Sequence, residues 1–568
     1  MLPLELQWPE FRGDPVVQRP GCGWRSGWRL RAAVCGAALF FICPPSAQAL
    51  QPADDFPGSV VDEEQFEDLQ FDTEQLPRPA PQRGTVQPRQ GTVLDPNQPG
   101  NIRRGAGQGI EGGGAGGTVL DPNQVGNLQA RLDALEAQGE ELPLIRLSGF
   151  LQLENGLYSQ NARALGYFGD MQDGVGFRRA RLQAIGKLTE FTAFTIEMDF
   201  AQPGRPSFVD VWGEKSEIPF FGTIRIGQFR QPGTMDSWTS VRHLNFLERS
   251  AAFQALDPFR RVGIMAYSMS EDERTSWAYS VFGTGLTFWN GTSTTYKTFG
   301  DNSTGTQIGD NGGVSFSSRI THLVHYDEPS EGRYLLHVGT GFLYSQLGGE
   351  GTSGEFAKTY RSSTFPEFFL GDPNGGGATA AGTPLVLDTG RYLATDFSLY
   401  HLELAFNRGQ FNFQSEVMLE PVNQLGGPLV LNSGAYMQCG YFLTGEHADY
   451  LKTAGVFDYN VDPFTPFFGT GRKGRIRGWG AWELAFRWSY VDLTSRNLNP
   501  ANQRPAIKPF QDPPYPQYGT LNESTLAINW WWNRAMRVQL NWIHSMPNYV
   551  GVGAVPFDIV GTRFQAEF

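Results

Sequence analysis

The sequence I-V-G-T-R-F-Q-A-E-F, at residues 559–568, carries its charged side chains only at alternate positions. Phe564 and Phe568 share one set of alternate positions, while Arg563 and Glu567 share the other. Successive side chains of a β-strand point to opposite faces, so this period of two predicts a strand with one apolar and one polar face. Soluble domains mostly end in frayed polar residues. Two interpretations therefore stay open, the closing strand of a membrane barrel or a strand of a soluble sandwich.

The composition suits a β-rich protein that is exported or embedded in a membrane. Of the 568 residues, 18% are charged, 13% are aromatic and 69 are glycine. The charged share is below the usual quarter of globular proteins. No apolar run reaches the roughly 18 residues that a membrane-spanning helix needs. These features are typical of membrane β-barrels, and a large secreted β protein would share them.

The first 49 residues have the pattern of a secretory signal peptide. A basic segment that ends at Arg31 precedes an apolar stretch at residues 32–43, and an A-Q-A cleavage site follows at residues 47–49. An apolar stretch of about twelve residues is too short to span a membrane. We therefore predict a signal peptide at residues 1–49 and export of the rest of the chain.

Residues 50–127 are polar and rich in Pro, Gly and Gln, and they contain one octapeptide twice. The two copies, G-T-V-L-D-P-N-Q, occupy residues 91–98 and 117–124. A solenoid needs about three or more packing repeats, so two copies of a turn-rich motif favour a disordered periplasmic linker. Contact of this linker with the cell wall or with a partner protein is the functional alternative.

Residues 128–140 are predicted to form a short helix. Leu128, Leu132 and Leu135 follow the spacing of one helix face. A helix of this length is not stable alone in water. It would be stable either as a short coiled coil in an oligomer or as a single capping helix, and the sequence leaves both open.

Strand-like alternation continues from residue 145 to residue 568. Phe194, Ile196 and Met198, for example, alternate with polar residues. A charge that faces the middle of a bilayer costs about 2–4 kcal/mol, which would keep one face of every strand uncharged. Many Trp and Tyr residues lie on or beside these strands, as in the aromatic girdles of membrane barrels. At roughly 26 residues per strand and connection, we predict an all-β transmembrane antiparallel β-barrel of about 16 strands at residues 145–568.

No constellation of residues points to catalysis, a metal or a cofactor. The chain has seven histidines, and His322 and His325 are spaced so that a strand would place them on opposite faces. Neither a P-loop nor a G-x-S-x-G motif is present in the sequence. We predict that the protein is not an enzyme, uses no cofactor and binds no nucleic acid. A barrel enzyme is the weaker alternative.

Arginine is the informative residue type between residues 177 and 264. Inward-facing arginines in a pore favour anions through charge and forked hydrogen bonds. Acidic residues such as Glu197 and Glu248 lie in the same stretch, so charge pairing without selectivity is the competing interpretation. The candidate pore-lining or anion-binding residues are Arg178, Arg179, Arg181, Arg225, Arg230, Arg242 and Arg249.

Several motifs occur in the same order as in the phosphate-selective porin O and P family, and the chain resembles that family from residue 145 to residue 568. Together they are more specific than any single one. The motifs are F-R-R-A-R-L at 177–182, G-Q-F-R-Q-P at 227–232, T-S-V-R at 239–242, F-L-E-R-S at 246–250, R-R-V-G at 260–263, Y-F-L-T-G-E at 441–446 and G-A-W-E-L-A at 480–485.

The resemblance implies a homotrimer of 16-stranded outer-membrane barrels, each with its own pore, and a periplasmic coiled coil that would suit residues 128–140. It also implies an arginine ladder that leads anions to a constriction, with Arg178, Arg179 and Arg181 as first candidates. Arg249 lies on a segment that either folds into the lumen or forms a structural turn. The chain departs from the family because it has no lysine cluster near the predicted constriction.

The sequence thus predicts a porin of the bacterial outer membrane that passes small solutes by diffusion. Small anions or phosphate are the candidate solutes. The expected partners are two further copies of the chain, membrane lipid and, through the linker, the cell wall. The alternative is a structural outer-membrane barrel that ties the membrane to the wall.

Overall fold

The computed structural model describes the part of the chain from Leu142 onward, which belongs to one compact unit, Gly109–Phe568. The predicted signal peptide, linker and short helix lie outside the described residues and stay predictions. The described residues are 142–201, 207–283, 313–347, 358–370, 383–467, 469–471, 474–476, 478–503 and 517–568.

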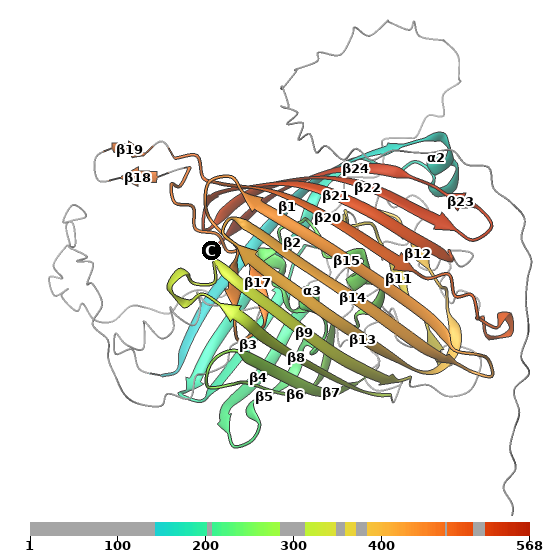
Figure 1. Ribbon diagram of the computed structural model, residues 1–568, viewed down its shortest axis with the longest axis horizontal. Coiled ribbons are helices and arrows are strands. Elements are labelled where there is room, and N and C mark those ends of the chain that lie inside the picture. The colour runs from blue at the N-terminus through green and yellow to red at the C-terminus, as the bar shows by residue number, and fades with distance from the viewer. Residues whose placement is uncertain are drawn as a thin grey trace, which may run out of the picture. The chain divides into compact units, whose positions relative to one another are not determined.

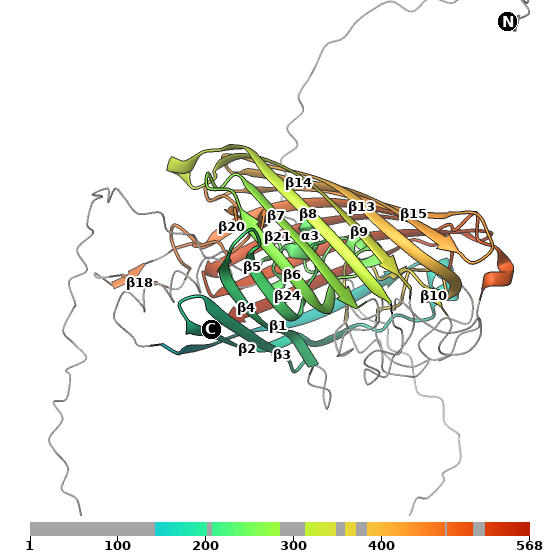
Figure 2. The same ribbon diagram turned by 90° about the horizontal axis from the view of Figure 1, so that it is seen from below.

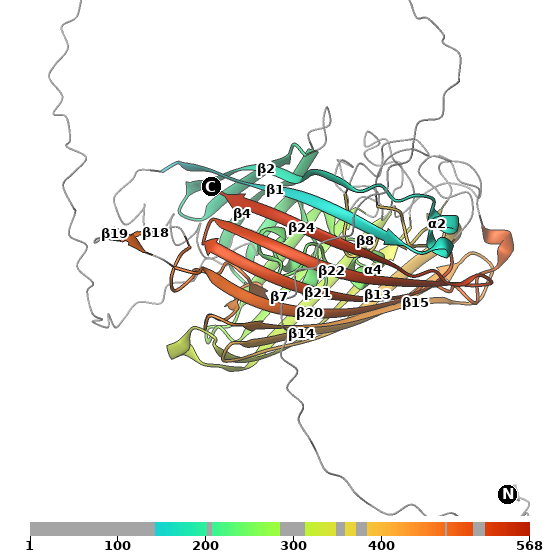
Figure 3. The same cartoon turned by 90° about the horizontal axis from the view of Figure 1, so that it is seen from above.

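Sixteen long antiparallel strands form a closed barrel, which confirms the predicted fold class (Figure 1). Each strand pairs with its neighbours in sequence, and β1 closes the barrel on β24, with Phe150 opposite Glu567 (Figure 3). The strands are β1 (Leu144–Gln160), β2 (Gly174–Thr189), β3 (Thr192–Asp199), β4 (Ser207–Ile218), β5 (Gly222–Arg230), β6 (Arg260–Met269), β7 (Thr275–Gly283), β8 (Val314–Tyr326), β9 (Tyr334–Gln346), β13 (Tyr392–Arg408), β14 (Phe411–Gln424), β15 (Val430–Phe442), β20 (Ala481–Asp492), β21 (Gly519–Asn533), β22 (Met536–Tyr549) and β24 (Phe557–Glu567).

Short elements decorate the connections between these strands. Within the described residues no helix is long and apolar enough to cross a membrane. The short elements are α2 (Ala162–Phe168), α3 (Met235–Trp238), η1 (Val241–His243), α4 (Ala251–Leu256), η3 (Glu328–Ser330), η4 (Pro500–Asn502), β10 (Thr359–Tyr360), β11 (Ser363–Thr364), β12 (Leu387–Asp388), β16 (Asp449–Leu451), β17 (Val456–Asp458), β18 (Gly469–Gly471), β19 (Gly474–Ile476) and β23 (Gly553–Ala554).

The strands bury their polar residues and expose their apolar ones. On β24, Arg563 is 1% exposed, whereas Val560 is 37% exposed. On β22, Gln539 and Asn541 are fully buried while Trp542 is exposed. This inverted pattern places the polar faces in the lumen and the apolar faces toward lipid, because a charge on the outer face would be costly there. The prediction for the two faces of the closing strand is confirmed.

Aromatic residues form a cluster on the outside of the barrel, where β20 begins and β21 ends. The rings of Trp482 and Trp530 stack with centroids 4.9 Å apart, and both indole N–H groups donate to the carbonyl oxygen of Trp479. Trp531, between two outward-facing tryptophans, points inward and is 2% exposed. The outer rings match an interfacial girdle, where the ring meets lipid and the N–H meets a polar group.

Candidate functional site

The connection between β5 and β6 folds into the barrel, and we call residues 231–259 the constriction loop. All of its residues except the half-buried Gln254 are buried, and its helix α3 lies within the ring of strands in both Figure 1 and Figure 2. A buried loop must find partners for its main-chain groups. Thr234 and Ser250 cap the two helices of the loop, and Asp257 accepts hydrogen bonds from the N–H and hydroxyl groups of Thr234.

Lumen-facing donors on one side of the barrel hold the carbonyl groups of this loop. Arg537 donates to the carbonyl oxygen of Leu244 at 2.8 Å. Arg487 donates to the carbonyl oxygen of Glu248, also at 2.8 Å. Arg563 donates to the carbonyl oxygen of a third loop residue, Leu247. These arginines of β20, β22 and β24 therefore fix the position of the loop.

A nearby strand of the same wall, β14, holds the start of α3. The Glu416 carboxylate on β14 accepts the main-chain N–H groups of Met235 at 2.6 Å and Asp236 at 3.0 Å. Carboxylates are favourable near exposed N–H groups at the start of a helix. Because the loop leaves from β5 and β6 and is attached to β14 and to β20–β24, which lie across the barrel from those strands, it crosses the lumen.

Two of the predicted site residues meet on one loop carboxylate. Arg178 and Arg179 on β2 contact Glu248 at 2.7 and 2.8 Å, and Arg563 lies 3.4 Å away. Burial alone would raise the pKa of Glu248, but the three arginines hold it well below its usual range. Glu248 is therefore an anionic anchor between the loop and the wall.

Two further candidates share an acidic patch on β3. Arg181 contacts Asp199 at 2.8 Å and Glu197 at 3.7 Å. Arg242 on the constriction loop lies 3.8 Å from the same Glu197, and its guanidinium stacks over Phe150 with 4.7 Å to the ring centre. These two arginines are thus brought together by one carboxylate.

The remaining three candidates lie elsewhere. Arg225 contacts Glu214 at 2.6 Å. Arg230 donates to three carbonyl groups of the constriction loop, and Arg249 donates to the carbonyl oxygens of Asp236 at 2.7 Å and Thr239 at 2.6 Å. Arg249 therefore does pair with Asp236, through the main chain. The seven candidates form separate groups with acidic or carbonyl partners, and their contact with a passing anion stays a prediction.

Sequence reasoning did not single out Arg487, Arg537 and Arg563. All three face the lumen from β20, β22 and β24, and each is at most 3% exposed. A signal was present, because each occupies a polar position on a strand whose alternate face carries no charge next to it. A rule that collected every arginine on an inward face, rather than those near the family motifs, would have found them.

A second inward segment enters from the connection between β15 and β20, and we call residues 446–461 the lumen hairpin. It contains β16 and β17, and Arg319 on β8 donates to its carbonyl groups at Ala454 (2.6 Å) and Gly455 (2.8 Å). Gly455 has a positive φ of 62°, and a Cβ there would lie 2.6 Å from the hydroxyl oxygen of Thr321. Only glycine permits so close an approach of the hairpin tip to the wall.

A third inward segment comprises residues 358–370 and 383–391, between β9 and β13. Its Glu367 accepts hydrogen bonds from Thr525 on β21 at 3.0 Å and from the N–H of Ala251 at the start of α4 at 3.2 Å. The segment therefore contacts both the barrel wall and the constriction loop. Three segments thus narrow the lumen, and the third belongs to a long connection that is rich in Gly, Pro and Ser.

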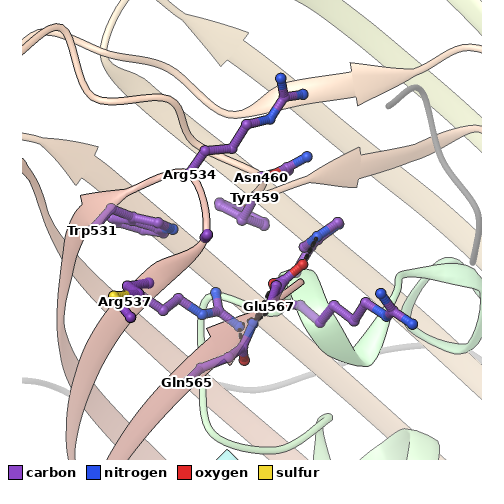
Figure 4. A pocket seen from close by; sticks show the side chains of 11 residues that line it. Tyr459, Asn460, Trp531, Arg534, Arg537, Gln565 and Glu567 are labelled. Carbon is purple, nitrogen blue, oxygen red and sulfur yellow. Dashed lines mark hydrogen bonds and ion pairs between the residues drawn. The ribbon is translucent and has the colours of Figure 1, made fainter. Parts of the chain in front are cut away.

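A pocket remains between the constriction loop, the lumen hairpin and β24 (Figure 4). Its free volume is about 10 Å³, which is room for about one water molecule. Basic groups dominate its lining, with Glu567 as the carboxylate among them. The residues used below are Arg242, His243, Tyr459, Arg534, Arg537 and Glu567.

His243 joins the loop to the hairpin at the edge of this pocket. Its imidazole contacts the Asp458 carboxylate of β17 and lies 3.6 Å from the Glu567 carboxylate. Burial lowers the pKa of His243, but the two carboxylates raise it by more, to about 9. His243 is therefore a cation at neutral pH and adds to the positive charge of the pocket.

Comparison with known proteins gives a family match and distant structural similarities. Solved structures similar to the chain include the anion-selective porin from Comamonas acidovorans, with a TM-score of 0.42 and 11% identity over 75% of this chain and 100% of that one. OmpT of Vibrio cholerae in its trimer form has a TM-score of 0.40 and 9% identity over 75% of this chain and 100% of that one. The channel DcaP of Acinetobacter baumannii has a TM-score of 0.38 and 10% identity over 75% of this chain and 97% of that one. Scores this low carry no argument about this chain. No curated protein sequence matches it.

The family match covers residues 159–568 and carries the description phosphate-selective porin O and P. It begins at the end of β1 and includes every later strand, the constriction loop and the lumen hairpin. A channel rather than an enzyme follows from the family and the fold together. The chain therefore belongs to the phosphate-selective porin O and P family and is a porin of the bacterial outer membrane.

Proposed function

We propose that this porin lets small solutes diffuse through each barrel with a preference for anions, phosphate included. The observation that supports the proposal is the pocket of Figure 4. Three arginines and the cationic His243 line it, against Glu567 and the neighbouring Asp458. Rings of basic side chains favour anions because they lower the electrostatic barrier to entry.

At the pocket four basic groups face three carboxylates, because Glu197 lies beside Arg242 and both Asp458 and Glu567 lie beside His243, so a small positive excess remains there. Buried arginines elsewhere have carboxylate or carbonyl partners, as Arg181 has Asp199 and Arg225 has Glu214. Paired charges cancel at the distance of a passing ion. We therefore assign selectivity to the few basic groups at the pocket rather than to all seven arginines predicted from the sequence.

Reversal potentials in planar bilayers test this proposal. In a potassium chloride gradient, the wild-type channel is expected to be anion-selective, and Arg534→Gln is expected to reduce that selectivity because Arg534 is an exposed residue of the pocket. Arg408→Gln is the matched control, since Arg408 is equally exposed but lies at the turn between β13 and β14. Current carried by cations would overturn the proposal, and replacement of chloride by phosphate would separate general from phosphate preference.

One observation favours the alternative of a structural barrel. Three inward segments fill much of the lumen, and a plugged barrel would show no stepwise conductance. The same bilayer recordings therefore decide between a channel and a structural protein. We propose neither catalysis nor a cofactor for the transport itself.

The homotrimer stays a proposal, which rests on the family resemblance of the sequence. Native mass spectrometry of the detergent-extracted protein would measure the oligomeric state. A mass that corresponds to one chain would overturn the homotrimer proposal. Contact with the cell wall through residues 50–127 is likewise a proposal, and pull-down of purified peptidoglycan by the exported chain would test it.

A further inference from the structure

A buried cluster of one histidine and two carboxylates lies inside the barrel on β13 and β14. The residues are His401, Glu403 and Glu416, and one nitrogen or oxygen atom from each lies within 4.8 Å of the others. Glu403 and Glu416 are directly opposite in the β13–β14 ladder. They are 4% and 1% exposed, and like charges placed opposite each other across two strands repel. A cation between them would remove this repulsion.

Charge pairing satisfies one of these carboxylates but not the other. Glu403 receives a forked pair of hydrogen bonds from Arg319, at 2.8 and 2.7 Å. Within the described residues, Glu416 has no ion pair with a basic side chain, and its partners are two main-chain N–H groups and the hydroxyl of Tyr436. The cluster therefore keeps an excess of negative charge, which a divalent cation would balance.

His401 supplies an independent observation. It is 3% exposed, and neither ring nitrogen makes a hydrogen bond. Buried imidazole nitrogens normally have a partner. Gly341 lies opposite it on β9, where a Cβ would be 2.2 Å from Nε2 of His401. The ring thus occupies room that a glycine leaves, and Nε2 is left without a hydrogen-bond partner.

One contact of the cluster has the spacing of two ligands on a shared metal. Nδ1 of His401 forms an ion-pair contact of 3.2 Å with Oε1 of Glu403 but makes no hydrogen bond. Zinc bonds nitrogen and carboxylate oxygen at about 2.0–2.2 Å, so two ligands of one tetrahedral ion lie about 3.3 Å apart. A shared metal would explain a short nitrogen–oxygen contact that is not a hydrogen bond.

The surrounding groups are those expected around metal ligands. Each carboxylate oxygen can accept at two positions, so Arg319 and His337 together leave one free position on Glu403, at Oε1. Nε2 of His337 lies 3.2 Å from Oε2 of Glu403, and its Nδ1 lies 2.6 Å from the hydroxyl of Tyr450. Hydrogen bonds of this kind orient ligating carboxylates and hold them in place.

We propose that His401, Glu403 and Glu416 bind one divalent transition-metal cation, with zinc as the first choice because one nitrogen and two oxygen ligands suit it. Glu416 also holds the start of α3. A bound ion would therefore tie β13 and β14 to the constriction loop. The site is separate from the basic pocket, so its presence does not depend on anion preference.

Metal content measures the site directly. The full chain is purified with a chelator, dialysed against Zn²⁺ and assayed by elemental mass spectrometry, and about one ion per chain is expected. His401→Asn is expected to lower the affinity at least about tenfold. His322→Asn is the matched control, because His322 is an exposed histidine on β8. Equal binding by wild type and His401→Asn, or no binding by wild type, would overturn the proposal.

Cobalt gives a second readout that surface histidines would not reproduce. Co²⁺ in a site of four or five ligands absorbs visible light, and the absorption is expected for wild type and for His322→Asn but not for Glu416→Gln. Heat-modifiable migration and circular dichroism identify folded barrels, so only folded variants are compared. Cobalt absorption that survives in folded Glu416→Gln would place the metal elsewhere and refute the assignment.

Discussion

The constriction loop and the lumen hairpin both lie inside the barrel, but they are attached to it differently. The loop is held by Glu416 and by Arg487, Arg537 and Arg563. The hairpin packs Tyr450 against the rings of Tyr326 and His337 and accepts hydrogen bonds from Arg319. Buried charged groups are costly to leave unpaired, but Arg319 would keep its forked pair with Glu403 if the hairpin were removed. We infer that the loop is part of the barrel framework and that the hairpin is an addition.

Deletion of the hairpin and deletion of the loop should differ most from each other, in folding and in single-channel conductance. Replacement of residues 446–461 by a short glycine-serine linker is expected to leave a folded barrel with at least about twofold higher single-channel conductance, because pore width sets conductance. Planar-bilayer recordings and heat-modifiable migration measure the two quantities.

The same linker in place of residues 235–256 is the matched experiment. It should prevent folding, since three wall arginines would lose their carbonyl partners inside the lumen. A folded loop-deletion variant would show that the loop, too, is an addition. Unchanged conductance after removal of the hairpin would place the hairpin outside the conducting path.

Arg563→Gln probes the attachment of the constriction loop. The Arg563 and Glu154 side chains form an ion pair in which both are fully buried, and the substitution leaves Glu154 without its cation. A lost partner of a buried pair costs about 3–5 kcal/mol. Thermal or urea unfolding of the detergent-solubilised protein measures the change.

Two further variants make that measurement specific. Arg534→Gln, an equivalent substitution at an exposed position, should change the unfolding free energy by no more than about 0.5 kcal/mol. Glu154→Gln added to Arg563→Gln should recover part of the loss, since the charge then disappears with its partner. Full additivity of the two substitutions would contradict the ion pair.

His243→Gln tests the junction between the two segments. The folded pKa of His243, about 9, exceeds its ordinary value. The stabilisation is therefore complete below about pH 6.5 and is lost as pH rises through about 9. At about 1.4 kcal/mol per pKa unit, the junction contributes about 3 kcal/mol.

The measurement is the unfolding free energy of wild type and variant at pH 6 and at pH 10. Wild type should be more stable than His243→Gln at pH 6 and nearly equal to it at pH 10. Asp458 on β17, Glu567 on β24 and Arg537 on β22 face the same region and are present in both proteins. A gap that persists at pH 10 would be inconsistent with the ion pair.

The sequence predicted the barrel well because the alternation of polar and apolar residues along a strand is a local pattern. Arg563 points inward and Val560 outward, as the period of two on the closing strand requires. The partners of the arginines could not be predicted in this way. Arg563 and Glu248 are 315 positions apart, and no local pattern links them. Sequence reasoning recognised the arginine-rich stretch. It could not predict that these side chains would form separate groups, each with its own carboxylate or carbonyl partners.

The lumen hairpin was missed for a related reason. The family motif at residues 441–446 marks the end of β15, but the residues that follow have no period that would distinguish an inward fold from a surface loop. Its direction depends on Arg319 of β8 and on the space beside Thr321, which lie more than a hundred positions away. The pocket that the hairpin bounds was therefore beyond prediction as well.

Tyr459→Phe gives the smallest expected loss of stability and tests whether the hairpin is attached less firmly than the loop. The Tyr459 hydroxyl donates to Oδ1 of Asn412 at 2.9 Å, and the tyrosine lines the pocket. Loss of a buried hydrogen bond costs about 1–3 kcal/mol when its partner is left unsatisfied. Asn412 keeps its hydrogen bond to Glu483, so we expect a loss of about 1–2 kcal/mol in thermal unfolding, below that of Arg563→Gln. A loss as large as that of Arg563→Gln would mean that the hairpin is as firmly attached as the loop, and the distinction between framework and addition would fail.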